Sequence, residues 1–400
     1  MRQKMFLVPL MIIILAAAAC EPDPSVVHKK AFVVDAHSDV LYRIAGHGGD
    51  FGVGSPNAQV DIEKLEKGGV DLQFLAVWVP SRYASEGEGD PDSSAYFADH
   101  LLDVFEEQLE RYPDRISLAL TPADARKIRD SGRTALSLGI EGGHAIENSI
   151  DKLEHFYERG VRYMTLTWAN STDWAVAARS ELDVGPERRG LTALGREIVR
   201  KMNELGMMVD ISHVHESTFW DVLEVSADPV IASHSCAAAL NPHHRNLTDE
   251  QMVRLANNGG VLCINFYPLF LDSAYRAAYN VAEEEYKSEI DSIRAMYRET
   301  DWGQYMSLRR QIFSRKTSEH EITIDRIIDH IDHVVAVAGI DHVGLGSDFD
   351  GIDVTPVGME DATKFPALTR RLLERGYSPE NVKKILGDNL MRVFSDVTEH

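Results

Sequence analysis

Histidines and carboxylates follow the apolar runs of this sequence, at the points where buried strands would end. The first run leads into a His-x-Asp pair, and two later runs each end in Ser-His. The residues at these positions are His37, Asp39, Glu141, His213, His234 and Asp348. Imidazole nitrogen and carboxylate oxygen are ligands that zinc, manganese and cobalt accept in proteins. The pattern predicts a metal-dependent site assembled from strand ends.

Three histidines and three carboxylates are enough ligands for two cations. A carboxylate must bridge two dications that lie about 3.5–4 Å apart. Glu141 is the natural bridge, because no lysine occupies a comparable strand end. His144 and His215 are alternative ligands on the same loops. We favour His213 over both, because its Ser-His context matches that of His234.

Each of these residues also has a purely structural interpretation. A lone histidine at a strand end is usually a hydrogen-bonded structural residue, and His-x-Asp pairs occur by chance. Asp348 lies beside glycines, which is typical of a turn. The joint pattern favours a metal site, because burying this much charge at one end of a fold without a cation is very costly.

The elements that would position these residues alternate regularly along the chain. The runs expected to be strands are 31–36, 72–79, 134–140, 162–167, 207–211, 229–233, 260–265 and 342–347. Helical patterns such as 94–111, 192–205 and 325–338 lie between them. Nearly continuous apolar strands are typical of a parallel sheet covered on both faces. The count predicts a TIM-barrel-like (β/α)₈ fold, whose active sites lie at the carboxyl ends of the strands.

The chain begins with a segment that is typical of export. Residues 1–20 combine a basic start, an apolar stretch and Cys20, which predicts a signal peptide of the lipoprotein type. Lipidation of Cys20 would attach the protein peripherally to the periplasmic side of a bacterial membrane. An ordinary cleaved signal would instead leave it periplasmic or secreted.

The rest of the chain is expected to be a linker and one large domain. Residues 21–30 are polar and contain two prolines, which predicts a linker before a single domain over 31–400. The charged segment at about 268–321 predicts a helical insertion after the seventh strand. It is either a solvated excursion or a lid or dimer contact.

Charge and cysteine content exclude two classes of site. The formal net charge is −22, and a field of that sign repels phosphate backbones, so no nucleic-acid partner is expected. No CxxC pattern is present, which argues against a thiolate zinc site. Cys236 and Cys263 follow apolar runs and are expected to be buried free thiols.

Together the motifs resemble those of the renal (membrane) dipeptidase family of zinc peptidases, over about 31–394. The matching motifs include Asp35-Ala36-His37-Ser38-Asp39, Glu141-Gly142-Gly143-His144, Asp210-Ile211-Ser212-His213, Ser233-His234-Ser235, Arg245-Asn246, Asn265-Phe266-Tyr267 and Gly346-Ser347-Asp348-Phe349-Asp350-Gly351. The resemblance implies a TIM-barrel-like hydrolase with two zinc ions per chain. It also implies dipeptide substrates, tolerance of D-residues at the C-terminal position, and a homodimer.

The resemblance further implies a role for each matching residue. The residues that would hold the first zinc are His37, Asp39 and Glu141, and those that would hold the second are Glu141, His213 and His234. Asp348 matches the acidic residue beside the bridging water and, with Glu141, is the expected catalytic carboxylate. Arg245 matches the arginine that binds the substrate's terminal carboxylate, a task suited to a bidentate guanidinium. Tyr267 is expected beside the substrate.

The chain departs from the family pattern at one position. Mammalian members carry a histidine where this chain has Trp168. Indole donates one hydrogen bond but cannot accept one or carry a proton. The role of that histidine toward the substrate carbonyl would weaken, or pass to Trp168 or to a neighbour such as Asn170. N-acyl amino acid deacylation and β-lactam hydrolysis are therefore alternative reactions, and a non-catalytic peptide-binding lipoprotein is a third interpretation.

Overall fold

The computed structural model describes residues 22–46, 49–54, 57–84, 93–179, 190–298 and 300–399. The predicted signal peptide and Cys20 lie outside these ranges. Among the described residues, no helix has both the length and the apolar character needed to cross a bilayer.

Eight parallel strands form the central barrel, in the order β1-β2-β4-β5-β6-β7-β8-β9. Their bounds are β1 Val34–Ser38, β2 Leu72–Trp78, β4 Thr134–Glu141, β5 Val161–Thr165, β6 Met208–Asp210, β7 Ile231–Ser235, β8 Val261–Ile264 and β9 Val343–Leu345. A parallel bridge between Ser38 and Phe349 brings the first and last strands together. The predicted TIM-barrel-like architecture is confirmed.

One strand was not predicted. β3 (Ile116–Leu118) pairs with the first residues of β4, off the path of the barrel. Two of its three residues are only half-buried, so the strand lacks the apolar run that identified the others.

Every residue of the eight barrel strands is buried. One face packs inside the barrel and the other packs against helices, which explains why the sequence shows runs rather than alternation. Phe74 and Tyr163 belong to the interior cluster, and Phe394 of α17 (Asn389–Thr398) packs with them at the amino end of the strands. Cys236 and Cys263 are buried and unpaired, as predicted.

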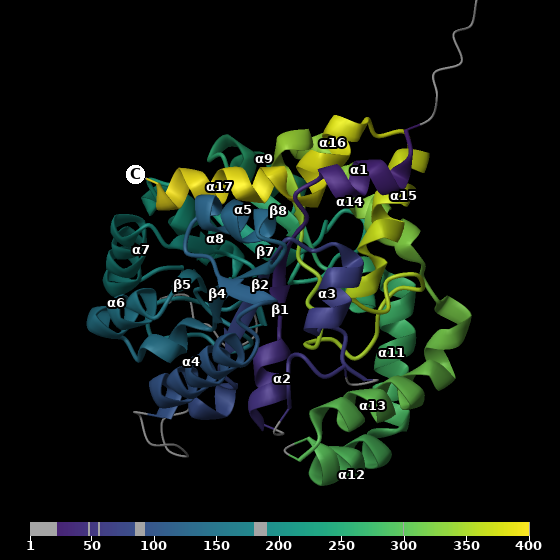
Figure 1. Cartoon of the computed structure of the whole chain (residues 1–400). Helices are drawn as coiled ribbons and strands as arrows, with labels where there is room; N and C mark the ends of the chain where they lie inside the picture. Colours follow the sequence, from purple (N-terminus) through teal and green to yellow (C-terminus); the bar gives the residue numbers. More distant parts are fainter. Residues whose placement is uncertain are drawn as a thin grey trace, which may run out of the picture.

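Helices surround this barrel (Figure 1). Those outside the insertion are α1 Pro24–Lys30, α2 Val40–Gly46, α3 Ile62–Gly68, α4 Ser93–Arg111, α5 Pro122–Asp130, α6 Ile150–Glu158, α7 Ala193–Leu205, α8 Glu216–Val225, α9 Asp249–Asn257, α14 Ile324–Ala338, α15 Phe365–Glu374, α16 Pro379–Lys383 and α17. Side-chain caps define several starts; Thr121 and Thr248 form capping boxes at α5 and α9.

The expectation of a linker over 21–30 is wrong for most of that segment, because residues 24–30 form α1. Val27 and His28 are buried in this helix. The His28 ring lies 2.8 Å from the Gly68 carbonyl and 2.6 Å from the Thr369 hydroxyl. The sequence predicted a solvated linker because histidine counts as a polar residue, whereas His28 is buried in the structure.

The segment predicted as a helical insertion follows β8 at the carboxyl end of the barrel. It contains α10 Pro268–Leu271, α11 Ser273–Glu285, α12 Lys287–Tyr297 and α13 Trp302–Thr317. In Figure 1, β1 runs toward α2 at the end of the molecule where α12 and α13 lie. Trp302 contacts Tyr42 of α2 edge-to-face, with the ring centroids 5.1 Å apart. The insertion therefore packs beside the strand ends that carry the chemistry.

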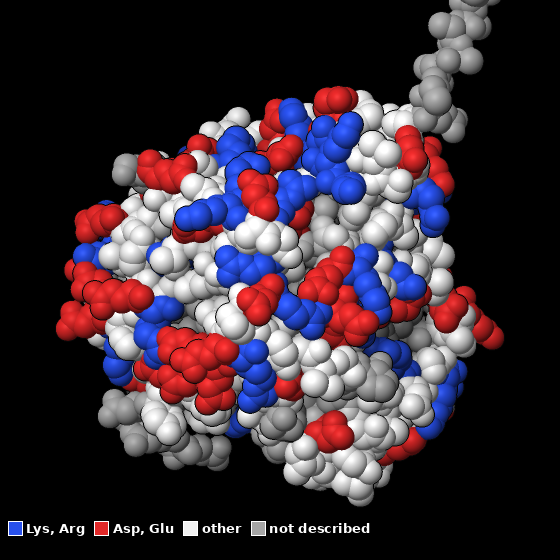
Figure 2. Space-filling model, viewed as in Figure 1, with Lys and Arg blue, Asp and Glu red and all other residues white. Residues whose placement is uncertain are grey.

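The surface reflects the acidic composition. Figure 2 shows acidic side chains gathered over α4 and α6, with lysines and arginines interspersed elsewhere on this face.

Candidate active site

Four side chains from separate strand ends converge on one point at the carboxyl end of the barrel. Glu141 lies at the centre, where its Oε1 is 2.9 Å from His213 Nε2 and 3.5 Å from His234 Nε2. Its Oε2 is 3.5 Å from His37 Nε2. The structure thus places one carboxylate among three imidazoles, with at least one ring beside each of its two oxygens. A carboxylate that bridges two cations needs both of its oxygens placed in this way.

Two further carboxylates lie on the β1 side of this cluster. Asp39 Oδ2 is 3.7 Å from His37 Nε2. Potential ligand atoms of His37, Asp39 and Asp348 lie within 4.8 Å of one another, as do those of His37, Glu141 and His234. The Asp348 carboxylate therefore lies within ligand range of His37 and Asp39.

Unpartnered buried atoms indicate what the cluster fits. His37 Nε2 and Asp39 Oδ1 are buried and have no hydrogen-bond partner among the described residues. Such orphaned atoms are rare in proteins, because leaving a buried polar atom unpaired is unfavourable. Here they face other acceptor atoms. Two buried carboxylates, the half-buried carboxylate of Asp348 and three imidazoles gathered at one point suit divalent cations, zinc among them.

The ring orientation of His37 is set by Tyr163. The Tyr163 hydroxyl lies 3.2 Å from the Ala36 carbonyl, to which it donates. It therefore accepts from His37 Nδ1, at 2.8 Å. This places the proton of neutral His37 on Nδ1 and leaves the Nε2 lone pair free for a cation.

His234 is oriented in a similar way by a buried acid. The Ser233 hydroxyl donates to Asp210 Oδ2 at 2.6 Å and accepts from His234 Nδ1 at 2.7 Å. Asp210 also accepts the backbone N–H groups of Ser212 and Ser233, at 3.0 and 2.8 Å. One carboxylate thus fixes the ends of β6 and β7 and the tautomer of His234.

Neighbouring groups in this cluster have pKa values shifted in opposite directions. Burial raises the pKa of Glu141, but the His37 charge and hydrogen bonds from the imidazoles outweigh it and hold that pKa well below its usual range. Burial and the Glu141 charge raise the pKa of Asp39 well above its usual range. Burial and the nearby Arg245 charge lower the pKa of His213 to about 4, which keeps this ring neutral, the form that binds a metal.

A glycine makes the approach of Asp39 and Asp348 possible. A Cβ on Gly351 would lie 2.1 Å from Asp39 Oδ2 and 2.7 Å from Asp348 Oδ1. Asp348 has a positive φ of 64° and accepts from Asn265 Nδ2 at 2.9 Å. This steric role of Gly351 could not be predicted from local sequence, because it arises only when the β9 loop folds against β1.

Gly139 of β4 supports the site from the neighbouring strand. A Cβ on Gly139 would lie 2.0 Å from the Tyr163 ring. Gly139 therefore makes room for the tyrosine that orients His37, and this support for the site was missed.

The two alternative histidine ligands point elsewhere. His144 Nε2 donates to the Val79 carbonyl at 2.9 Å, and burial lowers the pKa of His144 to about 4. His215 caps α8 by accepting from the Ser217 N–H at 3.1 Å. Of the three competing histidines, only His213 contacts Glu141.

Trp168 and Asn170 lie near the rim of the cluster. The Trp168 ring is 6.4 Å from the His213 ring and packs edge-to-face on Trp78 at 5.1 Å. Asn170 lies farther out, with Nδ2 3.4 Å from His144 Nδ1. The tryptophan is therefore placed beside one of the three imidazoles.

Arg245 lies between the ends of β6 and β7. Its guanidinium donates to the carbonyls of Ser212 and His234, the latter at 3.1 Å, and its Nε is buried without a partner among the described residues. Burial lowers the pKa of Arg245 to about 10, so the group is still charged at neutral pH. It holds a fixed positive charge next to the cluster.

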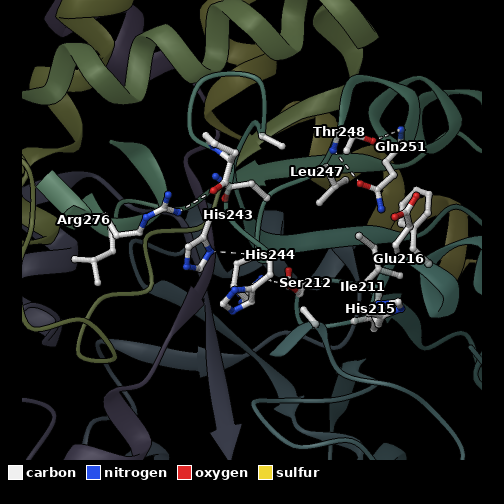
Figure 3. Close-up of a pocket in the computed structure, with 18 of the residues that line it drawn as sticks. Ile211, Ser212, His215, Glu216, His243, His244, Leu247, Thr248, Gln251 and Arg276 are labelled. Atoms are coloured by element: carbon white, nitrogen blue, oxygen red, sulfur yellow. Dashed lines mark hydrogen bonds between the residues drawn. The ribbon is translucent and has the colours of Figure 1, made fainter. Parts of the chain in front are cut away.

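A cavity of about 600 Å³ adjoins Arg245. Figure 3 shows His243, His244 and Arg276 on one side of it and His215 and Glu216 on the other. His243 and His244 are stacked, with ring centroids 4.2 Å apart. None of the residues around Glu141 lines this cavity, so it neighbours the cluster without containing it.

Tyr267 belongs to a network that reaches into the insertion. Its hydroxyl donates to Asp353 Oδ1 at 3.2 Å. The other oxygen of Asp353 accepts from Tyr279 at 2.6 Å and from Arg309 at 2.9 Å. Asp353 of the β9 loop thus joins Tyr267, the residue expected beside the substrate, to α11 and α13.

Comparison with known proteins decides the family. The model of the membrane dipeptidase family, peptidase family M19, matches residues 24–400. The chain belongs to this family. The chain is therefore a metal-dependent dipeptidase with the TIM-barrel-like fold of this family.

Similar dipeptidases and metallopeptidases come from fungi and bacteria. Dipeptidase tcpJ of Claviceps purpurea is 34% identical over 373 residues, covering 92% of this chain and 73% of the fungal one. The structure of dipeptidase AC, a metallopeptidase, has 25% identity and a TM-score of 0.73, covering 92% of this chain and 99% of the other. A Rhodobacter sphaeroides metallopeptidase bound to a phosphinate mimic of L-Ala-D-Ala shares the fold, with 24% identity, a TM-score of 0.73 and coverage of 92% and 99%.

Proposed function

We propose that this protein hydrolyses dipeptides at a centre of two zinc ions that share Glu141. One ion would be held by His37, Asp39 and Glu141, and the other by Glu141, His213 and His234. The observation that carries the proposal is the position of Glu141, with one oxygen toward His37 and the other toward His213 and His234. When bound, two such cations supply a water of lowered pKa and polarise the scissile carbonyl.

The remaining chemistry falls to residues of this chain. Asp348 takes the proton of the attacking water and delivers it to the leaving amine. Burial raises the pKa of Asp348, which makes it a better base than an exposed aspartate. Asn265 holds Asp348 by its hydrogen bond to Oδ2. Trp168 borders the substrate on the His213 side and donates one hydrogen bond there.

Arg245 would bind the terminal carboxylate of the substrate, which restricts hydrolysis to short peptides. Replacing Arg245 with methionine is expected to lower kcat/KM for a dipeptide by about 10²-fold, the scale of a lost buried charge pair. The same change should barely affect the corresponding dipeptide amide. The measurement is the ratio of kcat/KM between the acid and the amide, in the wild type and in Arg245→Met. An Arg245→Met variant that still prefers the free acid as strongly as the wild type would exclude the clamp.

A substitution at Gly351 tests the part of the proposed metal centre that lies beside Asp39. Gly351→Ala would place a methyl group against Asp39, so we expect loss of one cation per chain and about a 10²-fold fall in activity. Zinc content after dialysis measures the first effect. Gly46→Ala is the matched control, because a Cβ on Gly46 meets nothing within 4 Å. Full zinc content in Gly351→Ala would contradict the placement of the first ion beside Asp39.

A second candidate function is another amidohydrolase reaction, either N-acyl amino acid deacylation or β-lactam hydrolysis. Trp168 supports it, because this ring lies beside His213 at a position where mammalian relatives carry a histidine. A substrate panel separates the reactions. Dipeptides, including those with a D-residue at the C-terminal position, are compared with N-acylated amino acids and β-lactams, with zinc and with a chelator. We expect zinc-dependent hydrolysis of dipeptides to be fastest. Faster turnover of an N-acyl amino acid would favour the second candidate.

A further inference from the structure

A second cavity, of about 210 Å³, lies beneath the insertion. Its lining includes Arg294, Arg298, Trp302, Tyr305, Arg309 and Gly351. It is an open cavity bordered by the end of α12, by α13 and by the β9 loop.

None of the residues around Glu141 lines this cavity, and Gly351 is the lining residue that connects it to the carboxylates of Asp39 and Asp348. Trp302 donates from Nε1 to the Asp350 carbonyl at 3.0 Å, which fixes α13 to the same loop. In the strand order, β1 lies across the barrel mouth from β6, and the Ser212 carbonyl that follows β6 accepts a hydrogen bond from Arg245.

The cavity concentrates positive charge in a strongly acidic chain. Three guanidinium groups line it, against one carboxylate, Asp353, among the described lining residues. Arg309 is held by that carboxylate, with Nε 2.9 Å from Oδ2, and its side chain is 13% exposed. Arg294 instead pairs with Asp291 at the surface, where both side chains are more than 40% exposed. Such exposed pairs are weak, so Arg294 can turn to a better anionic partner at little cost.

We propose that this cavity receives the acidic side chain of the N-terminal residue of a dipeptide, which makes the enzyme selective for Glu-X and Asp-X substrates. The proposal rests on the proposed dipeptidase function. With the terminal carboxylate at Arg245 and the scissile bond at Glu141, the N-terminal residue lies on the Asp39 side, next to the cavity.

Size and chemistry fit this occupant. A volume of about 210 Å³ holds roughly seven waters at ~30 Å³ each, more than the five heavy atoms of a glutamate side chain. Trp302 and Tyr305 offer apolar surface to its methylene groups. Arg294 and Arg298 offer planar donors that match a carboxylate.

The test compares Glu-Ala with its neutral isostere Gln-Ala in the zinc-loaded enzyme. We expect the wild type to favour Glu-Ala by about 10- to 100-fold in kcat/KM, the range of a charge-assisted hydrogen bond. The double variant Arg294→Met, Arg298→Met should bring the ratio close to one. Arg315→Met is the control, because it removes an exposed α13 arginine that pairs with Glu289 at 2.6 Å outside the cavity. The control should keep the wild-type ratio.

Other results would overturn the proposal. A wild-type ratio near one, or a ratio unchanged in the double variant, excludes an acidic side chain from the cavity. An equal fall for both peptides in the double variant means that the cavity binds the terminal carboxylate instead.

Calorimetric binding of L-glutamate and L-glutamine to the zinc-loaded protein separates this proposal from the proposed function. If no dipeptide is hydrolysed, the proposed function fails. Preferred binding of L-glutamate that disappears in the double variant would still support the cavity, and equal binding of the two amino acids would overturn it.

Discussion

Replacing Glu141 with glutamine is expected to remove both cations and to lower kcat/KM for dipeptides by about 10³-fold or more. The carboxylate contacts His37 through one oxygen and His213 and His234 through the other, so it is the group shared by both halves of the centre. A neutral amide keeps the size of the side chain but cannot bridge two dications. Zinc per chain and kcat/KM, measured on the same preparation, check both parts of the prediction.

A surface glutamate provides the control for Glu141→Gln. Glu158→Gln at the exposed end of α6 makes the same chemical change and should leave zinc content and activity as in the wild type. Circular dichroism of each variant shows whether the fold is retained. A folded Glu141→Gln protein that still binds two zinc ions would rule out the bridging role.

Changing Asp348 to asparagine is expected to lower kcat by about 10²- to 10⁴-fold, the usual contribution of a general acid–base, while both zinc ions stay bound. Asparagine cannot accept a proton at neutral pH, but it tolerates the left-handed backbone that Asp348 adopts at φ 64°. The substitution therefore removes the proton carrier without straining the loop. Steady-state kinetics and zinc content together measure the effect.

The zinc content distinguishes two roles for Asp348. Its carboxylate lies within ligand range of His37 and Asp39, so a metal-binding role has a geometric basis. Loss of one zinc in Asp348→Asn would make Asp348 a ligand and contradict its role as the proton carrier. The exposed Asp114 provides a matched control, and Asp114→Asn should leave both quantities unchanged.

The residues of the cluster were predictable because barrel geometry turns sequence position into spatial position. Each of His37, Glu141 and His234 lies at the carboxyl end of a buried apolar run, and parallel strands bring such ends together. The same reasoning separated His213 from His215, since only the former shares the Ser-His context of His234.

The supporting residues were not predictable in this way. Tyr163 stands inside an apolar strand, and its contact with His37 depends on space at Gly139 in the neighbouring strand. Local periodicity carries no information about such pairing across strands. Asp353 and Arg309 are 44 positions apart, and their contact depends on how the insertion folds back over the barrel. The cavity beside Gly351 therefore became visible only in the folded chain.

Anomalous diffraction at the zinc edge, from crystals of the zinc-loaded protein, tests the shared-carboxylate centre most directly. We predict two anomalous peaks about 3.5–4 Å apart, one beside His37 and Asp39 and one beside His213 and His234, with Glu141 touching both. A single peak, or peaks that Glu141 does not touch, would contradict a two-metal centre.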